Sequence, residues 1–155
     1  MARLALAVDI GGTKILTALV RDDGAVLARA RVGTPAGVEP VVGAVAATIE
    51  QVLGTAVIPP AQVVAVGVGA PGPMNPTTGV VYEPPNIKGW RDVPLAALLA
   101  DRLGMRVYVE KDANAAAVAE RWVGAGRGWP ASRRGGLPGA GRCRWGCSSQ
   151  NSGRS

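Results

Sequence analysis

Apolar residues near the start of the chain fall into short runs, each of which ends at a polar or glycine-containing turn. The runs at residues 3–9, 15–21 and 25–32 are rich in Val, Leu, Ile and Ala, and such runs bounded by turn residues are typical of β-strands. Asp22-Asp23-Gly24 supplies the turn between the second and third runs. The three segments therefore predict an antiparallel meander.

Helical and strand-like patterns alternate along the rest of the chain up to residue 124. Residues 40–53 carry apolar side chains on every face, with Glu39 near the start and Gly54 after the end, which favours a helix packed on the sheet. Four further segments continue the alternation: a strand at 63–68, a helix at 95–103 ending at Gly104, a strand at 106–110 and an alanine-rich helix at 113–123 ending at Gly124. This order predicts an α/β fold, a mixed five-stranded sheet with helices on both faces.

The length and composition are those of one globular domain. A chain of 155 residues with 48% hydrophobic residues can bury a core and is not generally disordered. Residues 1–9 hold one Arg and a short apolar run without a cleavage region, and no run of 18 apolar residues occurs. We therefore expect a soluble, cytoplasmic protein that does not enter a membrane.

The net charge of +6 is confined to the end of the chain. Through Gly126, 11 Lys and Arg residues balance 11 Asp and Glu residues, whereas residues 127–155 hold six Arg and no acid. The excess of positive charge therefore lies in this final segment. It gives no reason to expect nucleic-acid binding by the domain that precedes it.

Residues 127–155 differ in composition from everything before them. They contain no Val, Ile or Thr, one Leu, seven Gly and five Ser, so they cannot build a core and predict a disordered basic Gly/Arg/Ser tail. Cys143 and Cys147 fall short of a zinc site because the sequence has no His and no further thiol. An arginine-rich nucleic-acid arm is the alternative, since Trp129 and Trp145 could stack on bases.

The glycine turn between the first two predicted strands carries the strongest chemical signal. In Asp9-Ile10-Gly11-Gly12-Thr13-Lys14, the glycines let backbone N–H groups approach phosphate oxygens because no Cβ intervenes. The carboxylate can orient Mg²⁺ or its waters, and the last two residues add a hydroxyl and a positive charge. A plain hairpin turn is the alternative. The acid at the strand end and the lysine favour a phosphate site, because open α/β folds bind ligands at the carboxyl edge of the sheet.

Two proline-rich loops are expected at the same edge. Val68-Gly69-Ala70-Pro71-Gly72-Pro73 leaves a strand through small residues whose backbone can lie close to a ligand, and a rigid structural loop is its alternative. Pro84-Pro85-Asn86-Ile87-Lys88-Gly89-Trp90 offers one amide side chain and one indole. Asn86 taken alone would more often be a turn residue than a ligand.

Asp112 is the candidate catalytic acid or base. It falls where the predicted strand at 106–110 gives way to the helix at 113–123, so its carboxylate can either cap that helix or face the ligand edge. Spacing alone does not separate the two roles. Asn114 is expected to form a local hydrogen bond near the helix start.

These motifs together resemble the ROK family of sugar kinases, the glucokinase-like members in particular, over about residues 4–128. Asp9 to Lys14 is similar to the family's first phosphate motif, Gly69 to Pro73 to its sugar-side loop, and residues 85–90 to its Asn-Leu-x-Gly-Trp stretch. Residues 112–117 with Glu120 resemble its catalytic segment. The order and spacing of all four are hard to obtain by chance.

The resemblance implies a fold, a reaction and a set of roles. The fold would be the ribonuclease-H-like, actin-like ATPase lobe, and the reaction would be ATP-dependent, Mg²⁺-dependent phosphorylation of a hexose. Asp112 would take the proton from the sugar hydroxyl as it attacks the γ-phosphate. Asp9 would help to position Mg²⁺ without ligating it directly. The phosphate site around it would include Gly11, Gly12, Thr13 and Lys14. The sugar side would include Gly72, Pro73 and Asn86. Family members are often homo-oligomers.

The sequence departs from the family pattern at Lys111 and after Gly128. Lys111 occupies the position of an Asn that hydrogen-bonds the sugar in the family, which leaves the hexose open, and a cation beside Asp112 would lower the pKa of that carboxyl. The family's second lobe brings another glycine-rich phosphate loop, a sugar-binding His and Glu, and a zinc site of one His and three Cys. This sequence contains none of these segments.

We therefore expect an N-terminal kinase lobe over residues 1–126, followed by a tail at 127–155. The Arg, Gly, Pro, Ser, Trp and Cys bias of the tail is that of GC-rich coding sequence read out of frame, which sequencing of the gene would test. A truncated chain of this kind should be inactive alone. Two alternatives stay open: a sugar- or nucleotide-binding lobe without catalysis, and a fragment of a ROK-type transcriptional regulator. The second is disfavoured because only three residues precede Leu4, too few for a helix-turn-helix segment.

Overall fold

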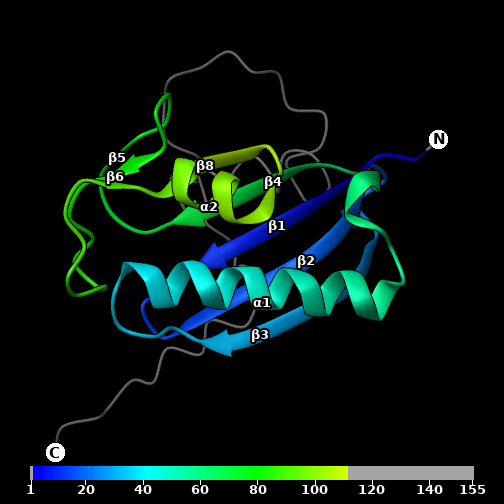
Figure 1. Ribbon diagram of the computed structural model, residues 1–155, viewed down its shortest axis with the longest axis horizontal. Helices are drawn as coiled ribbons and strands as arrows, with labels where there is room; N and C mark the ends of the chain where they lie inside the picture. Colours follow the sequence, from blue (N-terminus) through cyan, green and yellow to red (C-terminus); the bar gives the residue numbers. More distant parts are fainter. Residues whose placement is uncertain (1, 112–155) are drawn as a thin grey trace, which may run out of the picture.

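The computed structural model describes residues 2–111 of the chain. This part of the chain contains a mixed five-stranded sheet (Figure 1). Its strands, in the spatial order β3-β2-β1-β4-β8, are β1 (Leu4–Ile10), β2 (Lys14–Arg21), β3 (Val26–Gly33), β4 (Val63–Ala70) and β8 (Val107–Lys111). β2 pairs antiparallel with β1 and with β3, whereas β4 pairs parallel with β1 and with β8. The predicted meander and the predicted five-stranded mixed sheet are confirmed.

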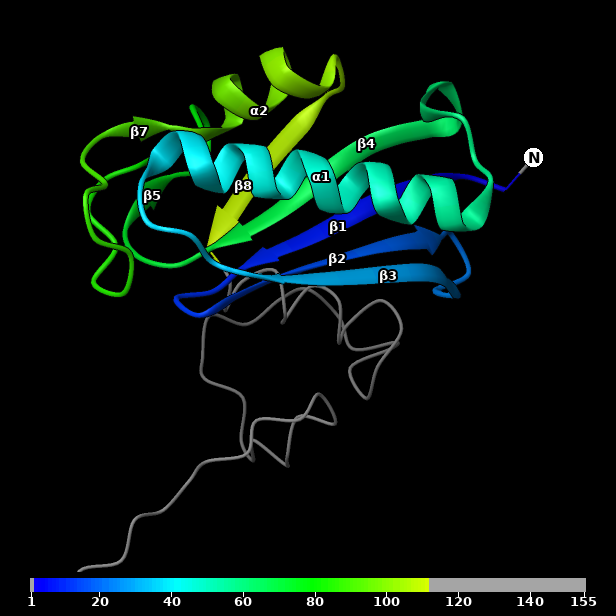
Figure 2. The same cartoon turned by 60° about the horizontal axis from the view of Figure 1, so that its bottom comes forward.

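Both described helices, α1 (Val38–Ala56) and α2 (Leu95–Leu103), cover the same face of this sheet (Figures 1 and 2). The alternation along β1 selects that face: Leu4, Leu6, Val8 and Ile10 are buried, and the residues between them are partly or fully exposed. The helix expected on the opposite face, at residues 113–123, lies outside the described residues. Within residues 2–111, neither helix combines the length and apolar character needed to span a bilayer.

The core lies between α1 and the sheet. Val41, Val45, Ile49 and Val52 recur at helical spacing along one stripe of α1 and are buried. They belong to one cluster with the inward residues of the strands and with α2: Leu6, Ile15, Leu19, Val66, Val68, Leu95 and Leu99. This packing fixes α1 and the sheet relative to each other, and with them the segments that leave the sheet's edge.

The helix α1 is longer than the sequence pattern predicts. It begins at Val38 and continues past Gly54 to Ala56, although Gly54 is the residue expected to end it. Val57 ends the helix instead, in a left-handed conformation with φ 55°, and its N–H donates to the carbonyl of Gly54. Leu53 is buried in the last turns, so tertiary packing extends the helix through a glycine whose intrinsic cost is about 1 kcal/mol.

The proline-rich stretch between β4 and α2 holds a small second sheet that the sequence did not predict. β4 runs through Gly69 and Ala70 before the chain turns. The chain then forms β5 (Met74–Asn75), β6 (Val80–Val81) and β7 (Val93–Pro94), which pair antiparallel. Strands of two residues are too short to show an alternation of apolar and polar positions. A short 3-10 helix, η1 (Pro60–Gln62), joins the α1 segment to β4.

Candidate functional site

The carboxyl ends of the three parallel strands meet at one edge of the sheet. The arrowheads of β1, β4 and β8 point to the same end of the molecule (Figure 2). The register aligns Asp9 of β1 with Gly69 of β4, and Gly69 in turn with Glu110 of β8. The segments predicted to carry chemistry follow these strands, so the fold collects them at the edge where open α/β sheets bind ligands.

The turn between β1 and β2 presents free backbone donors at this edge. The N–H of Gly11 donates to the carbonyl of Lys14 at 2.9 Å and closes the hairpin. Among the described residues, the N–H groups of Gly12 and Thr13 have no backbone acceptor. Gly11 is also tightly enclosed, since a Cβ there would lie 3.0 Å from the Lys14 carbonyl oxygen. A turn with two N–H groups that no described backbone carbonyl accepts suits an anionic ligand.

Asp9 and Lys14 lie on the sheet face opposite α1 and α2. Asp9 pairs with Leu16, and Lys14 precedes Leu16 by two residues, so all three share a face. Asp9 and Lys14 are both exposed. The carboxylate and the amine that the sequence assigns to the phosphate site therefore stand on the same side of the turn.

Backbone contacts join this turn to the loop around Asn86, and that loop to the turn after β4. A Cβ on Gly12 would lie 3.0 Å from the Cβ of Asn86, and a Cβ on Gly72 would lie 2.7 Å from the Cα of Pro84. Gly72 also has φ 90°, which favours glycine. A Cβ at Gly72 would collide with the backbone of Pro84, and a Cβ at Gly12 would press tightly on Asn86. The loop around Asn86 therefore contacts both the predicted phosphate turn and the turn after β4.

A protein-family model for the ROK family matches residues 5–131. The chain belongs to the ROK family. It is 43% identical over 125 residues to a glucokinase of Streptomyces coelicolor, a match that covers 81% of this chain and 38% of the relative. It is 41% identical over 73 residues to a putative xylose repressor of Caldicellulosiruptor, covering 46% of this chain and 17% of the relative.

The solved structures agree with the ROK assignment. A ROK glucokinase from Streptomyces griseus in complex with glucose and AMPPNP superposes with a TM-score of 0.74 at 40% sequence identity, covering 81% of this chain and 38% of that one. The expectation of an actin-like lobe is confirmed by this likeness. The chain spans about two fifths of the length of these glucokinases.

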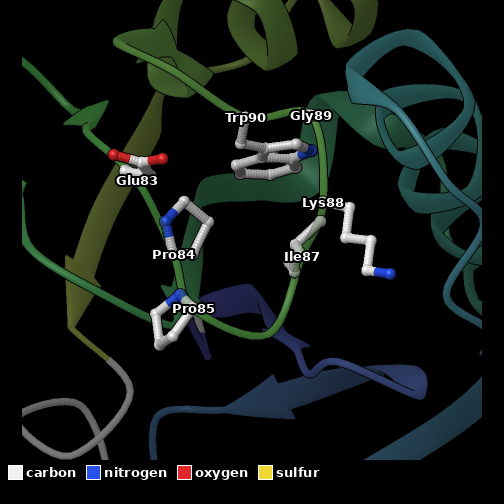
Figure 3. Close-up of a pocket in the computed structure, with 7 residues that line it drawn as sticks. All are labelled: Glu83, Pro84, Pro85, Ile87, Lys88, Gly89 and Trp90. Atoms are coloured by element: carbon white, nitrogen blue, oxygen red, sulfur yellow. The ribbon is translucent and has the colours of Figure 1, made fainter.

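The Asn86 loop of this ROK lobe surrounds an open hollow of about 510 Å³, formed by residues 83–85 and 87–90 (Figure 3). Trp90 borders this hollow, but its indole is almost entirely buried, whereas the sequence suggested an indole that a ligand could contact. Its side chain is 2% exposed and belongs to the hydrophobic core, together with Ile87. Its buried Nε1 has no hydrogen-bond acceptor among the described residues. The indole anchors the loop that carries Asn86, because burial of an aromatic ring fixes the backbone on either side of it.

Lys111 ends β8, where it pairs with Ala70 of β4 and is exposed. It therefore lies at the same edge as the glycine turn. The proposed base Asp112 and the helix-start residue Asn114 lie outside the described residues. The described part of the site accordingly comprises the phosphate turn, the two loops and Lys111.

Thr34 contacts the glycine turn and was not singled out from the sequence. It follows β3, and its hydroxyl donates to the carbonyl of Gly11 at 2.7 Å. Its own N–H donates to the carbonyl of Thr13 at 3.0 Å. A Thr before a Pro at a strand end looks like an ordinary turn residue. Only the antiparallel pairing of β2 with β3, which brings Gly33 beside Lys14, reveals the contact.

Proposed function

We propose that this chain is the N-terminal lobe of an ATP-dependent ROK kinase that phosphorylates a hexose hydroxyl. The observation that carries the proposal is the close approach of Gly12 to Asn86, which supports a site where the phosphate turn and the loop expected to contact the sugar act together. Phosphoryl transfer requires the two substrates to be held together and their charge to be offset. The glucose and AMPPNP bound to the Streptomyces griseus relative support the same pairing of ligands.

On the nucleotide side, the free N–H groups of Gly12 and Thr13 would hold phosphate oxygens of ATP, and Lys14 would offset their charge. The turn fits such a ligand because Gly12 carries no Cβ that would hold a phosphate oxygen away from its N–H. No group of three potential metal ligands occurs in the part of the chain that the structure describes. Mg²⁺ is commonly held by one or two carboxylates, waters and substrate phosphates, so Asp9 is suited to orient its waters. When bound, Mg²⁺ would neutralise charge on the phosphates.

On the sugar side, Gly72, Pro73 and Asn86 would line the hexose, with Lys111 in place of the family's Asn. Asp112 would act as the base that accepts the proton of the attacking hydroxyl. A Lys next to this base presents a charge that a neutral amide does not. The proposed substrate is a hexose, with glucose as the first candidate.

We further propose that residues 1–126 form this lobe, that the tail at 127–155 is not part of it, and that the 155-residue chain does not turn over alone. A kinase of this design closes two lobes around ATP and sugar to exclude water and align them. The match covers 38% of the length of the glucokinase relative, so the binding groups in the rest of that relative have no counterparts among the matched residues. Hexose phosphorylation by the purified chain should equal that of its Asp112→Ala variant.

Glucose binding tests the sugar side directly. We expect glucose to shift the side-chain amide resonances of Asn86 saturably in the ¹⁵N-labelled chain. Gln51 is the internal control, because its side-chain amide lies at an exposed position on α1, outside both loops. Equal responses of Asn86 and Gln51, or no response at either, would count against a hexose site at this loop.

A second candidate is a sugar-sensing lobe without phosphoryl transfer, favoured by the match to a putative xylose repressor. The two candidates predict different responses at the glycine turn. A kinase lobe binds Mg²⁺–ATP there, whereas a sugar sensor responds to the sugar alone. Titration with glucose, followed by Mg²⁺–ATP, therefore separates them.

A further inference from the structure

We infer that Thr34 is a positioning residue for phosphate binding, which holds the glycine turn so that its free N–H groups face the ligand. The inference rests on the proposed function for the identity of that ligand. It assigns a role to a residue outside the turn itself, on the segment between β3 and α1.

Two hydrogen bonds from one residue hold both sides of the turn. The Thr34 hydroxyl donates to the Gly11 carbonyl at 2.7 Å and its N–H donates to the Thr13 carbonyl at 3.0 Å. The side chain is partly buried. The bonded carbonyls belong to the Gly11–Gly12 and Thr13–Lys14 peptides, so the same residue holds the peptides on either side of the Gly12–Thr13 peptide.

The direction of the Gly11 carbonyl sets the direction of the Gly12 N–H. In a trans peptide the C=O and the following N–H point to opposite sides. Because the Gly11 carbonyl is directed at Thr34, the N–H of Gly12 points away from Thr34. This N–H has no backbone acceptor among the described residues, so it is available to an incoming phosphate oxygen.

The hydrogen bonds from Thr34 matter because the turn contains two adjacent glycines. Glycine visits positive and negative φ with similar ease, and a flipped Gly11–Gly12 peptide would present a carbonyl oxygen to the phosphate. A carbonyl there would repel the anion instead of binding it. The Thr34 hydroxyl stabilises the productive orientation against this flip and reduces the entropy lost when phosphate binds.

Variants at Thr34 separate the hydroxyl from the rest of the residue. Thr34→Val keeps the shape and the backbone hydrogen bond but removes the bond to Gly11, and Thr34→Ser restores it. Thr55→Val is a matched control, because the Thr55 hydroxyl donates to the Gln51 carbonyl at 2.8 Å at an exposed position on α1. Thr55 is far from the glycine turn along the chain. Thr34→Ala provides a second removal of the hydroxyl if Thr34→Val does not fold.

The measurement is ¹⁵N relaxation of Gly12 and Thr13 in the ligand-free, full-length chain, together with the Kd for Mg²⁺–ATP. We expect Thr34→Val to lower the order parameters of these amides from about 0.85 towards 0.6. Its Kd should rise about fivefold, the effect of losing one hydrogen bond. Thr34→Ser and Thr55→Val should keep wild-type order and a Kd within about twofold of wild type.

Unchanged order at Gly12 and Thr13 in Thr34→Val and Thr34→Ala would overturn the inference, as would equal changes in Thr55→Val. The relaxation measurement needs no ligand. If the wild-type chain fails to bind Mg²⁺–ATP, the proposed function fails, and the order parameters still decide whether Thr34 holds the turn.

Discussion

The hydroxyl oxygens of Thr17 and Thr48 lie 2.8 Å apart in the core between β2 and α1. Both side chains are buried. The Thr48 hydroxyl also donates to the carbonyl of Val45 at 2.9 Å. Since that hydroxyl has one proton, Thr17 must donate to Thr48. The sheet and the helix are therefore joined by a directed chain of two hydrogen bonds within an apolar core.

This direction predicts unequal effects of removing the two hydroxyl groups. Thr48→Val should lower the free energy of unfolding by about 1–3 kcal/mol, because it leaves the buried Thr17 hydroxyl without an acceptor. Thr17→Val should cost less, since Thr48 keeps its bond to Val45. The double variant should recover part of the loss. Urea unfolding measures all three, and equal losses in the two single variants would show that the direction is wrong.

Replacement of Val57 should stabilise the protein. Val57 ends α1 at φ 55° with 85% of its surface exposed, so a β-branched residue holds a conformation that costs an L-residue about 1–2 kcal/mol. Val57→Gly should raise the free energy of unfolding by about 0.5–1 kcal/mol, after the larger entropy of unfolded glycine is counted. Val57→Ala, which keeps the Cβ, should gain less. A gain from Ala equal to that from Gly would contradict the conformational cause.

The ion pair of Arg21 and Asp23 should make stability depend on acid pH. The two side chains approach to 2.5 Å in the turn between β2 and β3. The hydrogen bond from Arg21 and the N–H of Ala25 lower the pKa of Asp23 from its ordinary 3.8 to about 2. A lowered pKa means that the contribution is present above the unfolded value and is lost as pH falls through about 2.

An NMR titration of the Asp23 carboxyl checks this prediction, together with acid unfolding of Asp23→Asn. The variant should lack the part of the acid transition that Asp23 contributes. A midpoint for Asp23 near its ordinary value would show that the ion pair does not persist in solution.

A methyl group at Gly12 should disturb the contact that joins the two sides of the site. The added Cβ would lie 3.0 Å from the Cβ of Asn86, so Gly12→Ala should displace the Asn86 loop and weaken binding of glucose and Mg²⁺–ATP together. Gly43→Ala is the matched control, because no atom lies within 4 Å of its added Cβ on α1. It should raise stability by about 0.5–1 kcal/mol without changing ligand binding. Calorimetry of both variants decides, and unchanged binding in Gly12→Ala would contradict the contact.

Elements with a local signal could be predicted from the sequence. The helix α2 ends at Gly104 in the expected left-handed conformation, with φ 64°, because glycine adopts it without strain. The same rule failed at Gly54, where packing of Leu53 and its neighbours carries α1 onward. A local rule identifies where a helix can end, and tertiary contacts decide whether it does.

Residues whose roles depend on distant partners could not be predicted. The sequence placed the Trp90 indole in a loop expected at the ligand edge, and the fold buries this side chain in the core. Thr34 acts on the glycine turn because the β2–β3 pairing brings it there. Both outcomes depend on which strands become neighbours. The glycine turn itself was recognisable because its residue types carry their chemistry within six consecutive positions.

Titration of the ¹⁵N-labelled 155-residue chain with Mg²⁺–ATP tests the central claim, that the turn between β1 and β2 binds nucleotide phosphate. We predict saturable shifts of the Gly12 and Thr13 amide resonances. Gly24, in the β2–β3 turn at the opposite end of β2 and with its N–H bonded to the Arg21 carbonyl at 2.8 Å, should not shift. Shifts confined to other regions, or equal at Gly12 and Gly24, would contradict the account.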